Sequence, residues 1–551
     1  MVWLTGGALG LCVLMIVGML WLVGMQGVAT FKPRELVRWT TVDGGVLLGE
    51  VVEIERYRPN DAQLELLSEA TRAAARERLA AQGGEAERRL VRTENFELTG
   101  THYTWVSDFE TRERTTPEWA LSIERREGGP FYGVLRGFEL DGRRIAGEPE
   151  AAWTLLEEQL PAVLERVDAR RAIEREEIGR VNRAMEAERL AVRRAELEHG
   201  LDTAAARTAR ELFSARELGF KTEFERLRGE IEALDRQNSR CALRVEAADG
   251  SEQRIPLAAI VRTYPANRLD FGDRVSIYTS RTWEFSSGEP RESNTEGGVL
   301  PAIFGTVTMT LVMSILVVPF GVLAALYLRE YAKPGPLVSF VRIAVNNLAG
   351  VPSIVFGVFG LGFFCYFVGA SIDELFYAER LPSPTFGTGG VLWASLTLAL
   401  LTLPVVIVPT EEALAAVPSS MREGSYACGA TKWQTIRRIV LPRAMPGILT
   451  GMILAIARGA GEVAPLMLVG AVKLAPELPI DGEAPFVHPS RSFMHLGFHI
   501  YDLGFQSPNS EAAKPMVYTT TLLLIGLVVL LNVVAIAVRA NLRRRFQGAQ
   551  V

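Results

Sequence analysis

Two oppositely charged residues stand four positions apart in an otherwise apolar stretch of the chain. Arg458 and Glu462 lie within residues 447–470, where nearly every other residue is apolar or small. This spacing predicts that both side chains share one helix face, and an arginine in a membrane span should face a partner or a water-filled path. A guanidinium is always charged and its fork binds two oxygens, which suits a phosphate group. We therefore expect either an anion path or a structural ion pair, and the two residues alone leave both open.

A second polar stretch, residues 423–442 (EGSYACGATKWQTIRRIVLP), separates two long apolar runs. We expect Ser420 and Glu423 to form a capping box, in which the serine caps a backbone amide and the glutamate reaches back. Gly429 can take the left-handed conformation that ends a helix, and Thr431 begins a second capping-box pattern. The sequence therefore predicts a helix, a tight turn and a second helix, which form a small rigid projection suited to docking on another protein.

Six apolar runs are long enough to cross a membrane as helices. They cover residues 4–29, 299–328, 350–370, 388–409, 447–470 and 516–538. The first run has no lysine or arginine before it and exceeds the length of a signal-peptide core, so we expect an uncleaved first helix. The sequence thus predicts an all-α polytopic membrane protein with six transmembrane helices and a large inserted domain.

The lysines and arginines of the short loops set the expected orientation. They are frequent after the second, fourth and sixth runs, whereas the loop at 371–387 is net acidic. Both termini should therefore lie in the cytoplasm, with the insertion outside, in the periplasm if the membrane is the inner membrane of a Gram-negative bacterial cell. The expected parts are a first transmembrane helix (1–31), an external domain (32–298), a transmembrane core (299–545) with a cytoplasmic loop (411–443), and a cytoplasmic tail (546–551).

The external segment combines expected strands and helices. Short alternating stretches at 45–58, 95–140 and 241–280 predict strands. Residues 151–238 are dense in Ala, Glu, Arg and Leu, which favour helix, and the chain breaks this pattern at 199–202. We therefore expect an α+β domain with a long antiparallel helical hairpin of coiled-coil character. The hairpin is either a solvated arm without chemistry or a docking or sensing arm, and the sequence does not decide between them.

Other chemistries find less support. A net charge of -5 over 551 residues gives no case for a nucleic-acid partner. His495 and His499 stand four apart, but no carboxylate or cysteine completes a convincing metal-ligand set, and we expect an external interfacial helix there. Cys241 is the single cysteine of the external segment, so we expect it to be a small buried apolar residue. The sequence holds no G-x-x-x-x-G-K-[ST] phosphate loop, so we expect no cofactor in this chain and ATP hydrolysis by another subunit.

The polar stretch resembles the EAA loop of ABC-importer permeases, whose pattern is E-A-A, three residues, G, nine residues and I-x-L-P. Residues 423–425 (EGS) stand for E-A-A, and Gly429 and 439–442 (IVLP) follow at the same spacing. Three further stretches are similar to phosphate-importer permeases of the PstA type: 296–306, 347–362 and 455–467. The chain resembles a long variant of that family with a large external insertion. The resemblance implies the MetI-like fold of type I importers.

The resemblance also implies that the polar stretch is a coupling helix that docks on a separate ATP-binding subunit, which would bind ATP and magnesium. The implied coupling residues are Glu423, Gly424, Ser425, Gly429, Ala430 and Thr431. The implied partners are a homologous permease subunit (PstC-like), a dimer of ATP-binding subunits (PstB-like), an external phosphate-binding protein (PstS-like) and membrane lipid. The implied function is inward phosphate transport by alternating access, with Arg458 and Glu462 in the anion path.

Two alternatives to phosphate import stay open at this point. The substrate can be another oxyanion, such as molybdate or sulfate, because the pocket partner lies outside this sequence. The chain can also be a membrane-anchored sensor or scaffold, in which the helical arm is the working part. A coupling helix argues against the scaffold, since a simple anchor needs no docking helix of this pattern.

Overall fold

The computed structural model describes residues 2–60, 64–65, 67–81, 83–507 and 510–547. The chain forms two compact units. The bundle unit contains Met1–Thr30, Ser286–Glu289 and Val299–Val551, and the sheet unit contains Phe31–Phe285 and Pro290–Gly298. The apolar runs expected to cross a membrane therefore lie in the bundle unit.

Six helices of the bundle unit are long and apolar enough to cross a membrane, counting the described residues. They cover Trp3–Ala29, Leu300–Tyr331, Ser353–Phe376, Val391–Ala415, Lys432–Gly461 and Glu511–Asn541. The elements concerned are α1 (Val2–Ala29), α9 (Leu300–Leu326), α11 (Ser353–Phe359) with α12 (Ala370–Phe376), α13 (Val391–Ala415), α15 (Lys432–Thr435) with α16 (Leu441–Gly461), and α19 (Ser510–Gln547). This result confirms the six spans expected from the sequence.

The fifth span differs from the expected range 447–470. The chain stays helical from α15 through a π-helical turn at Ile436–Val440 into α16, and leaves the helix at Glu462. A short helix, α17 (Ala464–Val469), follows. The apolar composition continues across this break, but the ring of Pro465 would clash with the carbonyl four residues earlier in a continuous helix. The span therefore begins and ends earlier than hydropathy alone predicts.

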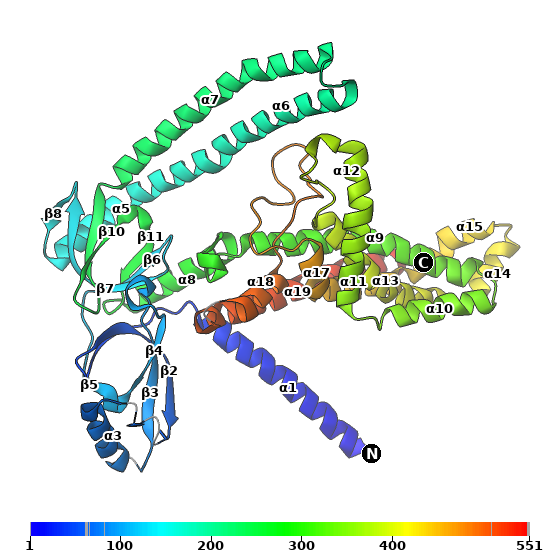
Figure 1. Ribbon diagram of the computed structural model, residues 1–551. Coiled ribbons are helices and arrows are strands. Elements are labelled where there is room, and N and C mark those ends of the chain that lie inside the picture. The colour runs from blue at the N-terminus through cyan, green and yellow to red at the C-terminus, as the bar shows by residue number, and fades with distance from the viewer. Residues whose placement is uncertain (1, 61–63, 66, 82, 508–509, 548–551) are drawn as a thin grey trace. The chain divides into compact units, whose positions relative to one another are not determined.

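Helices α9, α13 and α16 form the centre of the bundle unit. Met309, Met313 and Leu398 are fully buried there. A Cβ on Gly321 of α9 would lie 2.6 Å from the Val406 side chain of α13, so this glycine permits a close helix approach. By contrast, α1 is exposed along most of its length and contacts α19 near its C-terminal end (Figure 1). The exposed apolar face of α1 is the surface expected of a lipid-facing helix.

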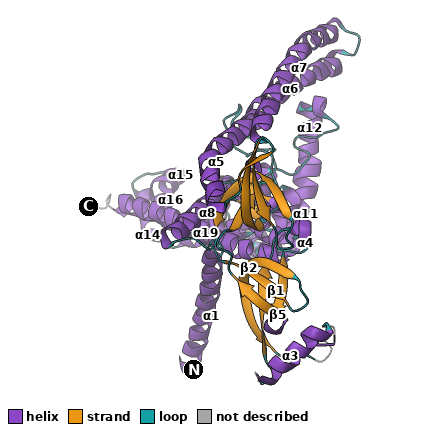
Figure 2. Ribbon diagram, turned by 90° about the vertical axis from the view of Figure 1, so that its left-hand side faces the viewer, coloured by secondary structure: helices purple, strands orange, loops and turns teal. Residues whose placement is uncertain are grey.

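The described residues of the sheet unit form two larger antiparallel sheets (Figure 2) and a two-stranded antiparallel pair, β12 (Pro290–Arg291) with β13 (Glu296–Gly297). The first has the order β4-β3-β2-β1-β5, formed by β1 (Leu36–Thr41), β2 (Val46–Tyr57), β3 (Ala86–Arg92), β4 (Tyr103–Ser107) and β5 (Thr111–Thr115). The second has the order β10-β9-β7-β6-β11 with β8 beside β7, formed by β6 (Ala120–Arg125), β7 (Phe131–Leu140), β8 (Arg143–Ala146), β9 (Cys241–Glu246), β10 (Glu252–Pro256) and β11 (Ile260–Pro265). The smaller helices are α3 (Glu69–Ala81), α4 (Phe96–Thr99) and α8 (Phe271–Ser287).

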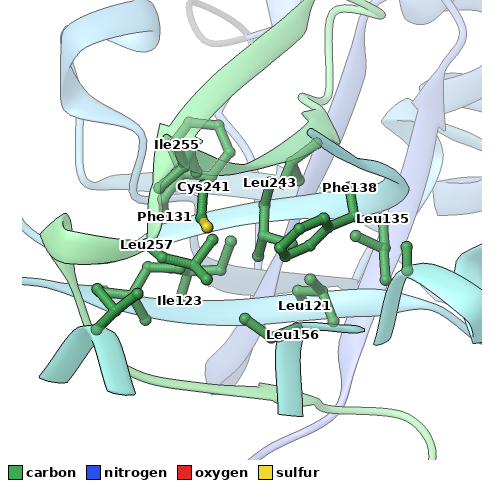
Figure 3. Packing of buried hydrophobic residues seen from close by; sticks show 14 of the residues in the cluster. Leu121, Ile123, Phe131, Leu135, Phe138, Leu156, Cys241, Leu243, Ile255 and Leu257 are labelled. Atoms are coloured by element: carbon green, nitrogen blue, oxygen red, sulfur yellow. The ribbon is translucent and has the colours of Figure 1, made fainter. Parts of the chain in front are cut away.

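The main core of the sheet unit lies between the second sheet and helix α5 (Pro149–Ala172). Leu121, Leu135 and Leu243 from three strands pack with Leu156 of α5, and all four are 0–1% exposed (Figure 3). Cys241 belongs to this cluster, and burial raises the pKa of its thiol. The expectation that Cys241 is a buried small residue is confirmed.

A long helical hairpin leaves this core. It runs through α5, a π-helical turn at Ile173–Glu177 and α6 (Ile178–His199), and returns as α7 (Ala204–Asn238) (Figure 1). Gly200 has a φ of 92°, and Thr203 caps the start of α7, so the chain turns where the helix-forming pattern breaks. An ion pair between Arg170 and Asp235 at 2.9 Å joins the two helices near the base.

The three expected strand stretches all contain strands: β2 in 45–58, β4 to β7 in 95–140, and β9 to β11 in 241–280. Two of these stretches also contain a helix. Within 95–140, Phe96–Thr99 forms α4 between residues with positive φ, Asn95 and Gly100. Within 241–280, the chain enters α8 after Asp270, whose carboxylate accepts a hydrogen bond from the Asp273 N–H at 2.6 Å. The strand prediction was therefore wrong at Phe96–Thr99 and from Phe271 onward, and in the second case reciprocal capping by Asp270 and Asp273 begins a helix.

Candidate transport and coupling sites

The predicted helix, turn and helix form one compact projection in the bundle unit. It consists of α14 (Ser419–Ala427), a turn at Gly429 and α15, which lie together at one end of that unit (Figure 1). Gly429 has a φ of 78°, its N–H donates to the Tyr426 carbonyl at 2.9 Å, and the Ala430 N–H donates to the Ser425 carbonyl at 3.1 Å. This pair of bonds is a Schellman motif, so the left-handed glycine end expected here is confirmed.

The two expected capping boxes have different outcomes. Thr431 and Gln434 form a reciprocal box at the start of α15, as predicted. The box at Ser420 and Glu423 was wrong, because α14 begins after Pro418 without a side-chain cap. Proline fixes the φ needed just before a helix, so the helix starts one residue before the expected cap.

Arg422 fixes the projection to the rest of the bundle unit. Its guanidinium donates to the Val417 carbonyl at 2.6 Å and to the Leu414 carbonyl at 2.8 Å, which are free at the end of α13. It also forms an ion pair at 2.9 Å with Glu330, in the π-helical turn that ends the second span. Glu330 is 9% exposed, so the pair is well shielded from water. The sequence did not single out Arg422, although an arginine beside a helix end was a signal for it.

Further contacts hold α14 and α15 together. The hydroxyls of Ser425 and Thr435 lie 2.8 Å apart, with either one as donor. The Lys432 ammonium donates to the Glu330 carbonyl and lies 4.7 Å from the centre of the Tyr331 ring. The projection is therefore fixed at both of its helices.

The outer surface of the projection combines small, acidic and aromatic residues. Glu423, Gly424, Gly429 and Thr431 are exposed, whereas Ser425 and Ala430 are half-buried. Tyr426 is 42% and Trp433 54% exposed beside them. Two exposed aromatic rings on a rigid helical pair are typical of a protein-docking surface.

The charged pair of the fifth span is formed, but its setting differs from the expectation. The Arg458 and Glu462 side chains lie 3.5 Å apart, with exposed fractions of 34% and 21%. Arg458 lies in the last turn of α16, while Glu462 has the extended φ/ψ of the residue that ends the helix. The two residues therefore do not share a helix face, and the pair spans a helix end. A cation in the last turn of a helix also compensates the helix dipole.

The two candidate sites lie at opposite ends of one helical run. Thr431 caps the start of the run and Arg458 lies in its last turn. The run covers Lys432–Gly461, which at 1.5 Å per residue is roughly 40–45 Å long. The structure thus separates the coupling residues from the charged pair and connects them through continuous backbone.

The histidine segment is buried in the bundle unit. His495 precedes α18 (Leu496–Tyr501) and is 0% exposed, and His499 within α18 is 3% exposed. The Leu496 N–H donates to the Thr306 hydroxyl of α9 at 2.9 Å. The flanking Phe493 and Leu496 anchor the segment in the bundle core, and its place at the outer membrane interface stays a prediction. The residues that the structure describes contain no group of three or more His, Cys, Asp or Glu placed to hold a metal.

A polar cavity opens beside α10 (Pro336–Leu348), and its lining includes Arg329 and Ala415, the chain neighbours of Glu330 and Leu414, which bind Arg422. Its volume is about 280 Å³, and Arg342 and Asn346 line it together with Glu411 and Glu412 of α13. Arg342 forms an ion pair with Glu411. Sequence reasoning missed this cavity, because its lining residues come from segments far apart in the chain.

Residues 317–548 match the family model described as the binding-protein-dependent transport system inner membrane component. The matched range contains the projection, the charged pair and the buried histidines. This part of the chain is therefore similar to the permease subunits of binding-protein-dependent importers, as its EAA-like loop predicts.

Phosphate permeases are among the relatives of this domain. The phosphate transport system permease protein PstA of Mycobacterium leprae is 44% identical over 176 residues, which cover 32% of this chain and 52% of that protein. PstA of Yersinia pestis is 38% identical over 183 residues, covering 33% and 56%. The probable ABC transporter permease protein YqgH of Bacillus subtilis is 34% identical over 209 residues, covering 38% and 62%. The chain thus spans a little over half the length of these curated relatives, and the resemblance to PstA-type permeases is confirmed.

Among solved structures, one of the MetNI methionine ABC transporter in an inward-facing conformation aligns with 44% of this chain and 95% of that chain. The identity is 21% and the TM-score 0.31. A TM-score this low supports no further inference about this chain.

Proposed function

We propose that this chain is the transmembrane permease subunit of an ATP-driven importer of inorganic phosphate. The observation that carries the proposal is the set of PstA relatives at 38–44% identity, within a segment that matches the importer-permease family. Phosphate would move inward by alternating access between this chain and a homologous PstC-like subunit. An external PstS-like protein would deliver the anion.

The proposed site of coupling to ATP hydrolysis is the projection of α14 and α15. A dimer of PstB-like ATP-binding subunits would hold ATP and magnesium and contact Glu423, Gly424, Ser425, Gly429, Ala430 and Thr431. Three features support this assignment: the exposed rings of Tyr426 and Trp433, the Schellman turn, and the anchoring by Arg422. Because the projection is rigid, a movement of the ATP-binding subunits would displace the attached helices and would not be lost in motion of a flexible loop.

Two helical runs connect the projection to the far end of the bundle unit. One starts at Thr431 and ends beyond Arg458. The other, Leu300–Tyr331, holds Glu330 next to Arg422 at one end and Thr306 next to Leu496 at the other. We propose that a push on the projection shifts both runs together and so opens or closes the path near Arg458 and Glu462.

Arg458 is the proposed counter-charge for phosphate in the path. Its guanidinium is one-third exposed and is held 3.5 Å from Glu462. A guanidinium with free N–H groups can bind two phosphate oxygens, while the neighbouring carboxylate prevents the anion from binding too tightly. The chain would place both termini in the cytoplasm and residues 32–298, the proposed α+β insertion, in the periplasm.

The direct test is uptake by cells that lack their own high-affinity phosphate importer and carry the complete operon of this chain. Labelled phosphate uptake should appear with the operon and disappear when this chain alone is deleted. Excess sulfate or molybdate should leave that uptake unchanged. If the operon restores sulfate or molybdate uptake and not phosphate uptake, the permease assignment stands and the phosphate assignment is overturned.

A further inference from the structure

Two buried histidines in the bundle unit lack hydrogen-bond partners. His495 Nδ1 accepts a hydrogen bond from the Gly497 N–H at 3.1 Å. His495 Nε2 and both ring nitrogens of His499 have no partner among the residues that the structure describes. An unpaired polar group buried in a protein destabilises the folded state, whereas an apolar side chain of similar size does not. Two imidazoles at such positions therefore require a reason other than packing.

Their surroundings place the histidines beside the break that follows Arg458. A Cβ on Gly497 would lie 2.7 Å from the Val463 side chain, and Val463 directly follows Glu462 in the chain. On the other side, Leu496 is bound through its N–H to Thr306 of α9. The segment that carries both histidines thus fills the space between α9 and the α16–α17 break.

The charges near His499 come from the same segment and from the preceding loop. Asp502, 2% exposed, forms an ion pair at 3.1 Å with Lys473. Asp502 raises and Lys473 lowers the pKa of His499, but burial dominates and lowers it to about 4. Burial lowers the pKa of His495 to about 3. Both imidazoles are therefore neutral at physiological pH, and each has one N–H donor and one acceptor nitrogen.

We propose that His495 and His499 are substrate-contacting residues of the anion path, which bind a protonated oxyanion when the segment 494–506 moves away from the α16–α17 break. This inference rests on the proposed function and deepens it. Hydrogen phosphate both accepts and donates hydrogen bonds, so it matches His499, whose imidazole donates from one nitrogen and accepts at the other. His495 offers only its Nε2–H as a donor, because its Nδ1 already accepts from the Gly497 N–H. Sulfate has no proton to donate at neutral pH, so it leaves the acceptor nitrogen unpaired. A neutral donor also lets the anion leave more readily than a second positive charge would.

The test compares His499→Leu and His499→Gln in cells that carry the complete operon, with membrane abundance of each variant measured. Glutamine keeps one donor and one acceptor, whereas leucine keeps only the volume. We expect His499→Leu to lower phosphate uptake at low phosphate at least tenfold, with a raised KM and a thermal stability equal to or above that of the wild type. His499→Gln should retain most of the uptake. The matched control is Phe498→Leu, which perturbs packing on the same helix and should leave uptake near the wild-type rate.

The inference is overturned if the two His499 variants rank in the opposite order in phosphate uptake. If His499→Leu imports phosphate like the wild type and His499→Gln is unstable or inactive, the histidine is a packing residue. This result is distinct from failure of the proposed function, in which the wild-type operon itself imports no phosphate. If His499→Leu is too scarce in the membrane, His499→Met replaces it. Excess sulfate should inhibit phosphate uptake more strongly in this variant than in the wild type if His499 contacts the anion, and equally in both if it is a packing residue.

Discussion

The Arg422 guanidinium lies 2.9 Å from the Glu330 carboxylate and joins the α14–α15 projection to the end of the second span. The same guanidinium binds two carbonyls at the end of α13. One side chain thus holds three helical segments in register. If the projection receives a push from a partner, Arg422 is the residue that passes it to both neighbouring spans.

Replacement of Arg422 by glutamine should weaken this connection. The variant loses the ion pair and leaves Glu330 largely buried without its guanidinium, so we expect a loss of about 2 kcal/mol in the free energy of unfolding. Phosphate uptake should fall at the same time. Thermal unfolding of the detergent-solubilised complex and uptake in cells measure the two effects. Arg437→Gln is the matched control, because Arg437 is exposed; equal losses in both variants would contradict the anchoring role.

Replacing Gly429 by alanine tests the backbone geometry of the turn, because the added methyl group meets no neighbouring atom. No atom lies within 4 Å of a Cβ placed on Gly429, but its φ of 78° is a conformation that alanine adopts at a penalty of about 1–2 kcal/mol. Gly429→Ala should therefore distort the projection and reduce ATP-coupled uptake. Gly526→Ala is the control inside α19, also with open space around the added Cβ, and should stabilise that helix slightly and leave uptake unchanged. Similar uptake by the two variants would contradict a coupling role for the turn.

Acidification should destabilise the bundle unit through His495 and His499. Their folded pKa values, about 3 and about 4, lie below the unfolded value near 6.5. As the pH falls below 6.5, the unfolded chain binds protons that the folded chain excludes, so stability is lost until the pH reaches the folded values. Each histidine should lower the free energy of unfolding by about 1 kcal/mol at pH 5.5.

The measurement is the unfolding temperature of the purified complex between pH 7.5 and 5. His499→Leu should flatten the decrease, whereas His199→Gln at the exposed hairpin tip should leave it unchanged. A wild-type profile that is flat over this pH range would show that the imidazoles are hydrated or already charged.

Shortening the helical arm should distinguish the transporter hypothesis from the scaffold hypothesis. Removing residues 184–224 and closing the chain with a short Gly-Ser turn keeps Val181, Leu227 and the Arg170–Asp235 pair at the base. The core around Leu156 should then stay intact, and most phosphate uptake should remain at equal membrane abundance. The control replaces only residues 199–203 by the same turn. If the shortened chain imports no phosphate while the control imports it normally, the helical arm is essential for function and the scaffold hypothesis is favoured.

Much of this architecture follows from local physical rules that the sequence displays. Six apolar runs of sufficient length predict six spans, and the hairpin turns where Gly200 interrupts a strong helix-forming pattern. Gly429 and Thr431 carry the chemistry of a helix end and a helix start, so the turn between α14 and α15 was predictable.

The features that were missed depend on tertiary context. Hydropathy does not distinguish α16 from the apolar residues after it, because the chain leaves the helix at Glu462 within a stretch that stays apolar. The burial of His499 requires α9 and α19 to close around α18, and no periodicity in the segment reveals it. Arg422 and Glu330 meet because α14 folds back onto the second span, which sequence spacing alone does not encode.

The most direct test of the account is labelled phosphate uptake by the complete operon with wild-type chain, Arg458→Gln and Arg458→Lys, at equal membrane abundance. The account predicts uptake by the wild type, at least a tenfold loss in Arg458→Gln, and partial activity in Arg458→Lys, because an ammonium keeps the charge without the fork. Normal phosphate uptake by Arg458→Gln would show that Arg458 and Glu462 form a structural pair and that the anion path lies elsewhere. Absence of phosphate uptake by the wild type would contradict the phosphate assignment itself.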